Sequence, residues 1–588
     1  MRTLTNVLLA TAATLGTATG AVAQDGLTLY HPFNDTTTYL VDSLGTVVNA
    51  WPGTTTPGLS VYFLPDGDLM RTRNIGGGGP GGIAGGLERI SYDGTVEWQF
   101  TLLTSDLRPH HDIEVLPNGN VLLIVWEEIG GAAAIALGRD PNTVSTSFIP
   151  DGIYEVQPTG MTGGTIVWEW HAYDHLVQDF DASLPNFDVI ADRPERIDIN
   201  VASAGDWLHI NGIDYNPELD QIALSVPRFH ELWIIDHSTT TAEAAGSTGG
   251  NSGMGGDLLY RWGNPQAYGR GTATDQVFYT IHDVQWVLPG RPGAGNITVF
   301  NNGNGRPSGN WSSVDEITPP VDGGGNYTLV AGQAYGPAAL TWTYSDVATL
   351  YSNIMSGAER LENGNTLITE ATSGTIFEVT PAGSTVWTYV NPFGGLNWVF
   401  KAHRYADCDA NSVFDGADIA AGAADSDANG VLDACQANAS SFCDASDGAL
   451  ASCPCANPGA ADTGCDLAQA TGGARIDVLS QTSSPQNRVT LQGSGFPAAT
   501  SPTALVIRAE ALDPSSPVAF GDGLRCVGTP VVRLGATTAS AGTSTHVFGH
   551  GTMAGAGTFY YQLWFRNTPG SFCTPEAFNL SNGRALLW

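Results

Sequence analysis

The sequence predicts an all-β protein, and three observations support this prediction. The 588 residues include 73 glycines and 33 prolines, so the chain turns often. Phrases of β-branched residues followed by tryptophan recur along the first two thirds of the chain. Asn-Gly and Asp-Gly dipeptides, which supply the positive φ angles of tight hairpins, lie between many of the expected strands. A hydrophobic fraction of 42% with 15 tryptophans excludes a disordered chain.

Residues 1–23 have the features of a secretory signal peptide. A short charged start precedes an apolar stretch, and Ala21-Val22-Ala23 forms a small-x-small cleavage site. A membrane anchor is the weaker alternative, because the stretch is short and rich in alanine, threonine and glycine. No later segment has ~18 consecutive apolar residues, so no membrane span is expected. We expect the mature protein to begin near Gln24 and to be exported to the periplasm, the cell surface or the medium.

Residues 24–405 contain six copies of the tryptophan phrase. The copies lie at Trp51, Trp98, Trp168, Trp262, Trp342 and Trp387. Hairpin turns such as Pro65-Asp-Gly-Asp68 and Pro117-Asn-Gly-Asn120 fall between them, so each unit is expected to hold four strands. Repeated four-stranded units are typical of a β-propeller, and six copies predict six blades. A pair of β-sandwiches is the alternative, but it does not explain six similar phrases.

Both ends of this region are expected to build the last blade. Its outer strands would be residues 38–41 and 45–51, and its inner strand would run from Val399 to Tyr405. Closure by both ends would leave no open sheet edge between the first and last blades.

The chain is strongly acidic. It has 23 Lys+Arg against 58 Asp+Glu, a formal net charge of −35 and a pI near 4.4. Nucleic-acid binding and docking on anionic lipid both need basic patches, so neither class of partner is expected. Lys401 is the only lysine.

Two acidic loops between residues 406 and 440 predict calcium binding. Alternating oxygen-bearing side chains with a central glycine can surround a hard cation, and the pattern resembles thrombospondin type 3 or dockerin-like calcium repeats. An acidic linker is the alternative. The expected Ca²⁺ ligands are Asp407, Asp409, Asn411, Asp415, Asp418, Asp425, Asp427, Asn429 and Asp433.

Residues 441–588 are predicted to form a small disulfide-containing β-sandwich. All eight cysteines lie between Cys408 and Cys573, and an even number in an exported protein indicates disulfides. Cys453-Pro454-Cys455 could instead hold a metal, but an oxidising compartment favours disulfides. Short β-type runs alternate with turns, and no catalytic constellation is evident, so this domain would bind a surface or glycan or stabilise the protein.

Several histidines fall at one place in the repeat. The expected innermost strands begin with His110-His111, His209 and His282, so these side chains should converge at one mouth of the central channel. Arg360 and His403 could join them. Three histidines suit zinc, but Asn211 and Arg228 lie in the same segments, and a guanidinium beside a dication is unfavourable. Nucleophilic catalysis on an anionic group is the other interpretation.

These segments resemble the bacterial arylsulfate sulfotransferases. The likeness covers roughly residues 27–405 and is carried by residues 206–215, 222–230, 257–265, 281–286, 300–306, 356–368 and 400–405. The family implies a six-bladed propeller that moves a sulfuryl group from a phenolic sulfate ester to a phenol, without phosphoadenosine phosphosulfate or another catalytic cofactor.

The resemblance also implies residue roles. His282 corresponds to a nucleophile that becomes transiently sulfurylated, His209 and Asn211 to ligands of the sulfuryl oxygens, and His111 to a further channel histidine. Arg228 resembles the family's arginine. Water as acceptor would make the same site a sulfatase. A non-enzymatic ligand-binding propeller is the alternative function, and the discriminating observation is whether sulfuryl transfer occurs. The natural donor and acceptor and the oligomeric state stay open.

Overall fold

The computed structural model shows an all-β protein. It describes residues 23–76, 81–82, 84–144, 146–202, 205–289, 291–407, 411–423, 432, 440–445, 453–467, 470–482, 488–497, 502–512, 517–540, 542–549, 558–566 and 578–587. Residues 1–22 of the expected signal peptide therefore lie outside the described residues. No helix in the described ranges is long and apolar enough to cross a membrane.

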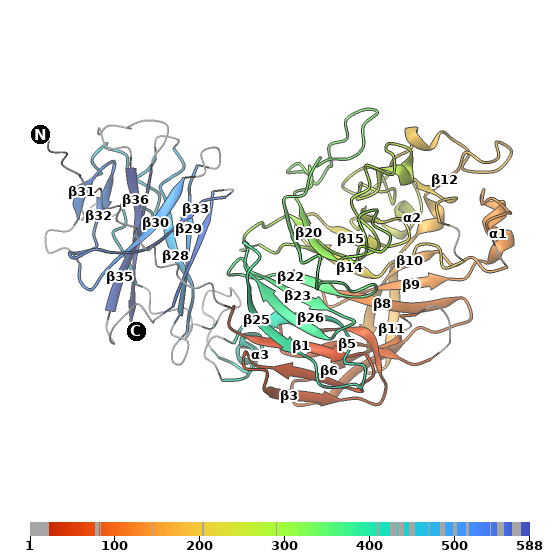
Figure 1. Cartoon of the computed structure of the whole chain (residues 1–588), viewed down its shortest axis with the longest axis horizontal. Coiled ribbons are helices and arrows are strands. Elements are labelled where there is room, and N and C mark those ends of the chain that lie inside the picture. The colour runs from red at the N-terminus through yellow and green to blue at the C-terminus, as the bar shows by residue number, and fades with distance from the viewer. Residues whose placement is uncertain are drawn as a thin grey trace, which may run out of the picture.

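Within the described part of residues 23–407, the strands form six four-stranded antiparallel sheets (Figure 1). In sheet order they are β26(Val399–Tyr405)-β1(Leu27–Pro32)-β2(Thr37–Val41)-β3(Val47–Pro52); β4(Pro57–Phe63)-β5(Leu69–Asn74)-β6(Gly85–Ile90)-β7(Val96–Thr101); β8(Leu107–Val115)-β9(Val121–Glu127)-β10(Asp151–Thr159)-β11(Gly163–His171); β14(Gly212–Asn216)-β15(Gln221–Val226)-β16(Glu231–Asp236)-β17(Tyr260–Trp262); β18(Ile281–Trp286)-β19(Ile297–Asn301)-β20(Ser313–Ile317)-β21(Trp342–Ser345); and β22(Gly357–Arg360)-β23(Thr366–Glu370)-β24(Thr375–Val379)-β25(Thr385–Val390).

Short elements lie in the connections between these sheets. They are α1(Gly130–Ala136), η1(Ala172–Asp174), β12(Leu176–Val177), η2(Ile190–Asp192), β13(Ile197–Asp198), α2(Thr241–Ala244) and η3(Pro265–Tyr268).

The sheets form a propeller-like ring. The first strands contact one another in the order β4, β8, β14, β18, β22, β26 and back to β4. The ring is closed within one sheet, because β26 pairs with β1, with Leu29 opposite His403. The prediction that both ends of the region share one sheet is confirmed.

Every repeated tryptophan lies on the fourth strand of its sheet, which explains the repeat. Each indole N–H donates a hydrogen bond to the following sheet or its connection, at 2.7–3.1 Å. The donor and acceptor residues are Trp51 and Tyr92, Trp98 and Gly163, Trp168 and Thr239, Trp262 and Pro337, Trp342 and Pro381, and Trp387 and Ser43. The last bond returns to the first sheet, so the tryptophans link neighbouring sheets around the whole ring.

The inner edges of the first strands are linked in a second way. The N–H groups on the inner edge of each first strand have no further strand to bond. Acidic side chains from the first strand of the preceding sheet therefore accept hydrogen bonds from them. The pairs are Asp112 with Ile213 (3.4 Å), Asp214 with Trp286 (2.5 Å), Asp283 with Ala358 (2.8 Å) and Glu359 with Arg404 (3.1 Å).

The only lysine lies across the centre of the ring. Lys401 Nζ on β26 donates to Asp112 Oδ2 on β8 at 2.7 Å and to Asp283 Oδ1 on β18 at 3.1 Å. Tyr62 donates to the other oxygen of Asp112 at 2.6 Å. Strands β26, β8 and β18 are alternate members of the ring, so the lysine joins three sheets that do not touch as neighbours.

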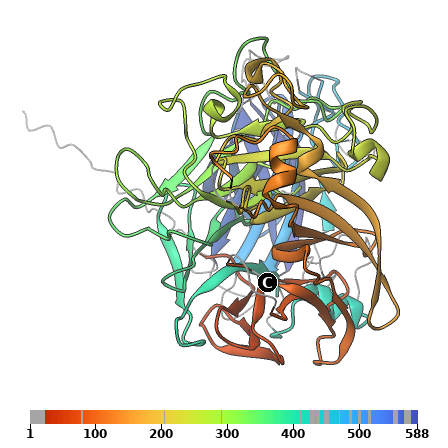
Figure 2. The ribbon, with the colours of Figure 1, turned by 90° about the vertical axis from the view of Figure 1, so that its right-hand side faces the viewer.

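In the described part of the C-terminal region, two sheets pack around one core. The sheets are β27(Ser440–Phe442)-β36(Phe578–Leu587)-β35(Thr558–Arg566)-β30(Thr503–Ala509)-β33(Val532–Thr538) and β28(Arg475–Thr482)-β29(Arg488–Ser494)-β34(Ser544–Gly549), with the hairpin β31(Val518–Phe520)-β32(Gly523–Arg525). Leu491 and Leu563 from the two sheets share the core. Disulfides join Cys443 to Cys526 and Cys453 to Cys465. Figure 2 shows these blue strands behind the ring.

Residues 411–423 pack on the ring. Phe414 precedes α3(Asp415–Ala420) and stacks on Phe63 with ring centroids 4.3 Å apart. Asp407 accepts the N–H of Asn411 at 3.0 Å, and the Asn411 amide donates to Asp418 at 3.0 Å. Four of the nine predicted calcium ligands, including Asp415, are thus described; Asp409, Asp425, Asp427, Asn429 and Asp433 lie outside the described residues.

Candidate active site

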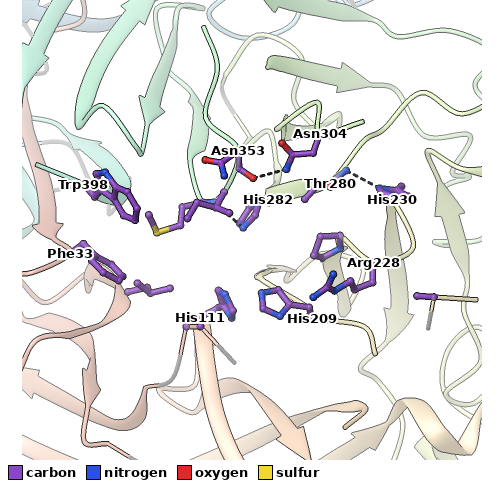
Figure 3. Close-up of a pocket in the computed structure, with 17 residues that line it drawn as sticks. Phe33, His111, His209, Arg228, His230, Thr280, His282, Asn304, Asn353 and Trp398 are labelled. Atoms are coloured by element: carbon purple, nitrogen blue, oxygen red, sulfur yellow. Dashed lines mark hydrogen bonds between the residues drawn. The ribbon is translucent and has the colours of Figure 1, made fainter. Parts of the chain in front are cut away.

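A cavity of about 650 Å³ lies at the start of the innermost strands, and it contains three of the predicted histidines (Figure 3). His111 comes from β8, His282 from β18, and His209 from the segment just before β14. Arg228, from the turn between β15 and β16, also lines the cavity. The repeat therefore brings side chains that are up to 171 positions apart in the sequence into one site.

The backbone around this cavity is strained. Seven of its lining residues have positive φ angles although none is glycine: Leu59 (119°), His111 (53°), Ala202 (58°), His209 (56°), His230 (58°), Thr280 (60°) and Met355 (57°). Such residues are uncommon and cluster at functional sites, where the surrounding fold holds them. The strain identifies this cavity, rather than another surface depression, as the candidate site.

His282 is held as one tautomer by its neighbours. The Asn302 side-chain amide donates to the carbonyl oxygens of Ser352 (2.8 Å) and Met355 (2.9 Å), which turns its Oδ1 toward His282 Nδ1 at 2.7 Å. Nδ1 must therefore carry the hydrogen. The N–H of Met355 donates to Nε2 at 3.1 Å, so Nε2 holds the lone pair. Burial lowers the pKa of His282 to about 3 despite the bond to Asn302, so the ring is neutral.

Asp206 joins His209 to Arg228. Its carboxylate accepts a hydrogen bond from His209 Nδ1 and lies 3.8 Å from the Arg228 guanidinium. The Arg228 side chain is 47% exposed, so its charge is open to the cavity. His230 accepts the N–H of Thr280 at 2.9 Å, and burial together with the charge of Arg228 lowers its pKa to about 4.

His111 leads into a buried chain of polar groups. Its Nδ1 lies 2.8 Å from Nδ1 of His110, and His110 Nε2 lies 2.7 Å from Asp151 Oδ1. Neither His110 nor Asp151 exposes its side chain. The His110 ring stacks on Trp126 with centroids 3.9 Å apart. Gly82 packs so closely on the face of His111 that an added Cβ would lie 2.2 Å from the ring.

The two sides of the cavity differ in character. Figure 3 shows Phe33 and Trp398 on one side and Arg228 and His230 on the other. The Phe33 and Trp398 rings are 5.8 Å apart, and Leu59 extends this apolar wall. A ligand with an aromatic part and an anionic part would fit both sides at once.

Four predicted site residues do not line the cavity. Asn211 is fully buried: its amide donates to the carbonyl of Ile281 at 3.0 Å and its Oδ1 accepts from Ser225 at 2.7 Å. Arg360 forms an ion pair with Glu316, between two sheets. His403 lies 3.5 Å from Glu359 and packs on Tyr62, and His110 lies behind His111. Asn211 thus fixes the strand that carries His282 instead of facing the cavity.

Sequence reasoning missed other residues of the site. His230, Thr280, Phe33 and Trp398 line the cavity, and Asn302 orients His282. They lie in loops and turns at the ends of strands, where no periodic pattern marks a residue as pointing inward. Among the residues that the structure describes, no group of three or more His, Cys, Asp or Glu side chains could hold a metal ion.

Comparisons with solved structures give only remote likeness. A protein of unknown function from Bacteroides caccae is 12% identical with a TM-score of 0.35, covering 64% of this chain and 98% of that chain. Virginiamycin B lyase from Staphylococcus aureus is 13% identical with a TM-score of 0.30, covering 63% and 82%. The β-propeller domain of Cps50 (Swd1) from Myceliophteria thermophila is 11% identical with a TM-score of 0.33, covering 64% and 89%. TM-scores this low support no conclusion about the chain.

The comparison of sequences is more specific. No curated protein matches the chain. The sequence model of the arylsulfotransferase (ASST) family matches residues 18–391, which is more than half of the chain. The matched region holds nearly the whole ring of sheets and all the histidines of the cavity. The chain therefore belongs to the arylsulfotransferase (ASST) family and is an aryl-sulfate sulfotransferase, a transferase that moves a sulfuryl group from a sulfate ester donor to a phenol acceptor.

Proposed function

We propose that this sulfotransferase is an exported, six-bladed propeller enzyme that works through a sulfohistidine at His282, without phosphoadenosine phosphosulfate. The observation that carries the proposal is the tautomer of His282: a neutral ring whose Nε2 lone pair is available once one backbone contact opens. A neutral imidazole nitrogen is a nucleophile, whereas an imidazolium is not.

In the first half of the reaction, His282 Nε2 attacks the sulfur of the donor ester and the phenolate leaves. The N–H of Met355 must release Nε2 for this attack. Met355 (φ 57°) and Ser356 (φ 84°) are consecutive residues in strained conformations, so a movement that relaxes them would offset part of the cost of breaking this bond. In the second half, an acceptor phenol attacks the sulfohistidine and restores Nε2.

The polar side of the cavity would hold the sulfuryl oxygens. Arg228 supplies a positive charge, and His209, oriented by Asp206, lies beside it. The aryl group would lie on the apolar side formed by Phe33 and Trp398. Asn211, placed outside the cavity by its own bonds, contributes by holding the carbonyl of Ile281, next to the nucleophile.

The regions outside the ring are assigned structural roles. Removal of residues 1–23 on export would leave Gln24 near the N-terminus. Calcium at Asp407, Asn411, Asp415, Asp418 and the second loop would neutralise a run of carboxylates and order residues 406–440. The disulfide-bonded β-sandwich of residues 441–588 would take no part in sulfuryl transfer.

Purified protein with an aryl sulfate donor, with and without a phenol and with no nucleotide, tests the proposal. We expect transfer to the phenol and, without acceptor, a sulfuryl adduct on the peptide that carries His282. The rate of phenol release without acceptor measures hydrolysis. An adduct on His111 or His209, or turnover that requires a nucleotide, would refute the proposed mechanism.

A further inference from the structure

The two halves of sulfuryl transfer move one proton in opposite directions. A leaving phenolate must gain a proton in the first half, and the acceptor phenol must lose one in the second. The complete reaction consumes none, so a group that keeps the proton between the halves would serve both steps.

The chain from His111 to Asp151 has the geometry for this task. Its two contacts, 2.8 Å between the histidines and 2.7 Å from His110 to Asp151, are both hydrogen-bond distances. Each contact links two atoms that can hold the hydrogen on either side. All three groups are at least 96% buried, since His111 is 4%, His110 1% and Asp151 0% exposed. Water therefore does not compete for these bonds.

We propose, on the basis of the sulfohistidine mechanism above, that Asp151 and His110 store the transferred proton and deliver it through Nε2 of His111. With Asp151 protonated, Asp151 donates to His110 Nε2, His110 Nδ1 donates to His111 Nδ1, and His111 Nε2 carries a hydrogen. With Asp151 ionised, every bond reverses and His111 Nε2 holds a lone pair.

In the first half, the nitrogen–sulfur bond to His282 forms as the sulfur–oxygen bond breaks, and the electron pair stays on the phenolic oxygen. That oxygen takes the proton of His111 Nε2; His111 Nδ1 takes one from His110, and His110 Nε2 takes one from Asp151. In the second half, the acceptor oxygen bonds to sulfur, the electron pair of the nitrogen–sulfur bond returns to His282, and the proton passes back to Asp151.

The surroundings favour a single mobile proton. Burial, followed by the nearby charge of Asp206, raises the pKa of Asp151 well above its ordinary value, so the carboxyl can be protonated. Burial, with His209 next in effect, lowers the pKa of both His110 and His111 well below the ordinary value, so neither ring holds a second proton. The N–H of Ile210 donates to Asp151 at 3.3 Å and keeps the carboxyl in place.

The variant Asp151→Asn separates this role from a structural one. Asparagine has the size of aspartate and can form a hydrogen bond with His110, but it cannot store the transferred proton. With 4-nitrophenyl sulfate, whose leaving group needs no proton, adduct formation on His282 should stay within about threefold of wild type. With phenyl sulfate it should slow by about 10²-fold, the scale of one lost general acid. His110→Phe keeps the stack on Trp126, should show the same selectivity, and should add nothing to Asp151→Asn.

Asp257→Asn is the matched control. Asp257 forms a similarly buried pair with His175 at 2.8 Å, away from the cavity, and its loss should not change the dependence on the leaving group. The relay is wrong if Asp151→Asn slows both donors equally or neither, or if Asp257→Asn reproduces its selectivity. If the wild-type protein forms no adduct at all, the sulfohistidine mechanism fails instead.

Discussion

Replacing Lys401 with methionine tests how far the site depends on the centre of the ring. The lysine contacts Asp112 and Asp283, and these residues directly follow His111 and His282. Methionine has a similar length but no charge, so Lys401→Met leaves two buried carboxylates without a cationic partner. Burial alone would lower the pKa of Lys401, but the two carboxylates outweigh it and raise the pKa, so the wild-type amine is charged.

The size of the effect follows from the geometry. At 2.7 and 3.1 Å, each contact is worth about 6 kcal/mol of attraction at an effective dielectric constant of ~20. Desolvation of the three groups, which are 1–3% exposed, opposes most of this attraction. Removing one partner of a buried pair typically costs about 3–5 kcal/mol. With an unfolding entropy of ~2.1 cal/mol/K per residue over roughly 380 residues, the melting temperature should fall by about 5 °C.

Calorimetry and single-turnover kinetics measure the two consequences. We expect the fraction of sulfurylated enzyme to reach the wild-type value while the rate of adduct formation falls about 10²-fold, since displacing a nucleophile by ~1 Å has that effect. Arg261→Met is the control, because Arg261 and Glu231 form a fully buried ion pair outside the cavity. This variant should be less stable than the wild type but form the adduct at the wild-type rate. An unchanged rate in Lys401→Met would refute the argument that this lysine positions the histidines.

Three further predictions concern the nucleophile, pH and calcium. His282→Asn should fold but form no sulfuryl adduct, as mass spectrometry of donor-treated protein would show; full activity would contradict the mechanism. The pKa values of about 3 for His282 and about 4 for His230 lie below the ordinary ~6.5. Between these values the unfolded chain binds more protons than the folded protein. The free energy of unfolding should therefore fall as the pH drops from 6.5 toward 4, by up to ~1.4 kcal/mol per pH unit per histidine. Thermal melts from pH 7 to 4 measure this loss, and a flat profile would contradict it. Chelation should increase protease cleavage within residues 406–440 and leave sulfuryl transfer intact; loss of turnover without cleavage would instead place a metal in the cavity.

The repeat made much of this protein predictable from its sequence. Trp51 and its five counterparts are visible because each must bond the following sheet, and that constraint recurs once per unit. His111 and His282 were found for the same reason, since they occupy equivalent positions before an aspartate. Phe33 and Trp398 were missed because loop conformation, not periodicity, turns them into the cavity. Asn211 was predicted to bind the sulfuryl oxygens, but its side chain does not line the cavity, because it bonds to Ser225, fourteen residues away, and to the carbonyl of Ile281.

The charge of the protein leads to a prediction about salt. A chain with a net charge of −35 repels an anionic sulfate ester, whereas Arg228 attracts it at the cavity. The repulsion acts over distances longer than the Debye length of ~10 Å at 0.1 M salt, so added salt screens it strongly. The attraction acts at contact distance and is screened much less. The value of kcat/KM should therefore rise modestly between about 10 and 200 mM salt. In Arg228→Met it should be lower than in the wild type at every salt concentration. A kcat/KM that decreases with salt would mean that local positive charge dominates the approach of the donor, and the repulsion argument would be wrong.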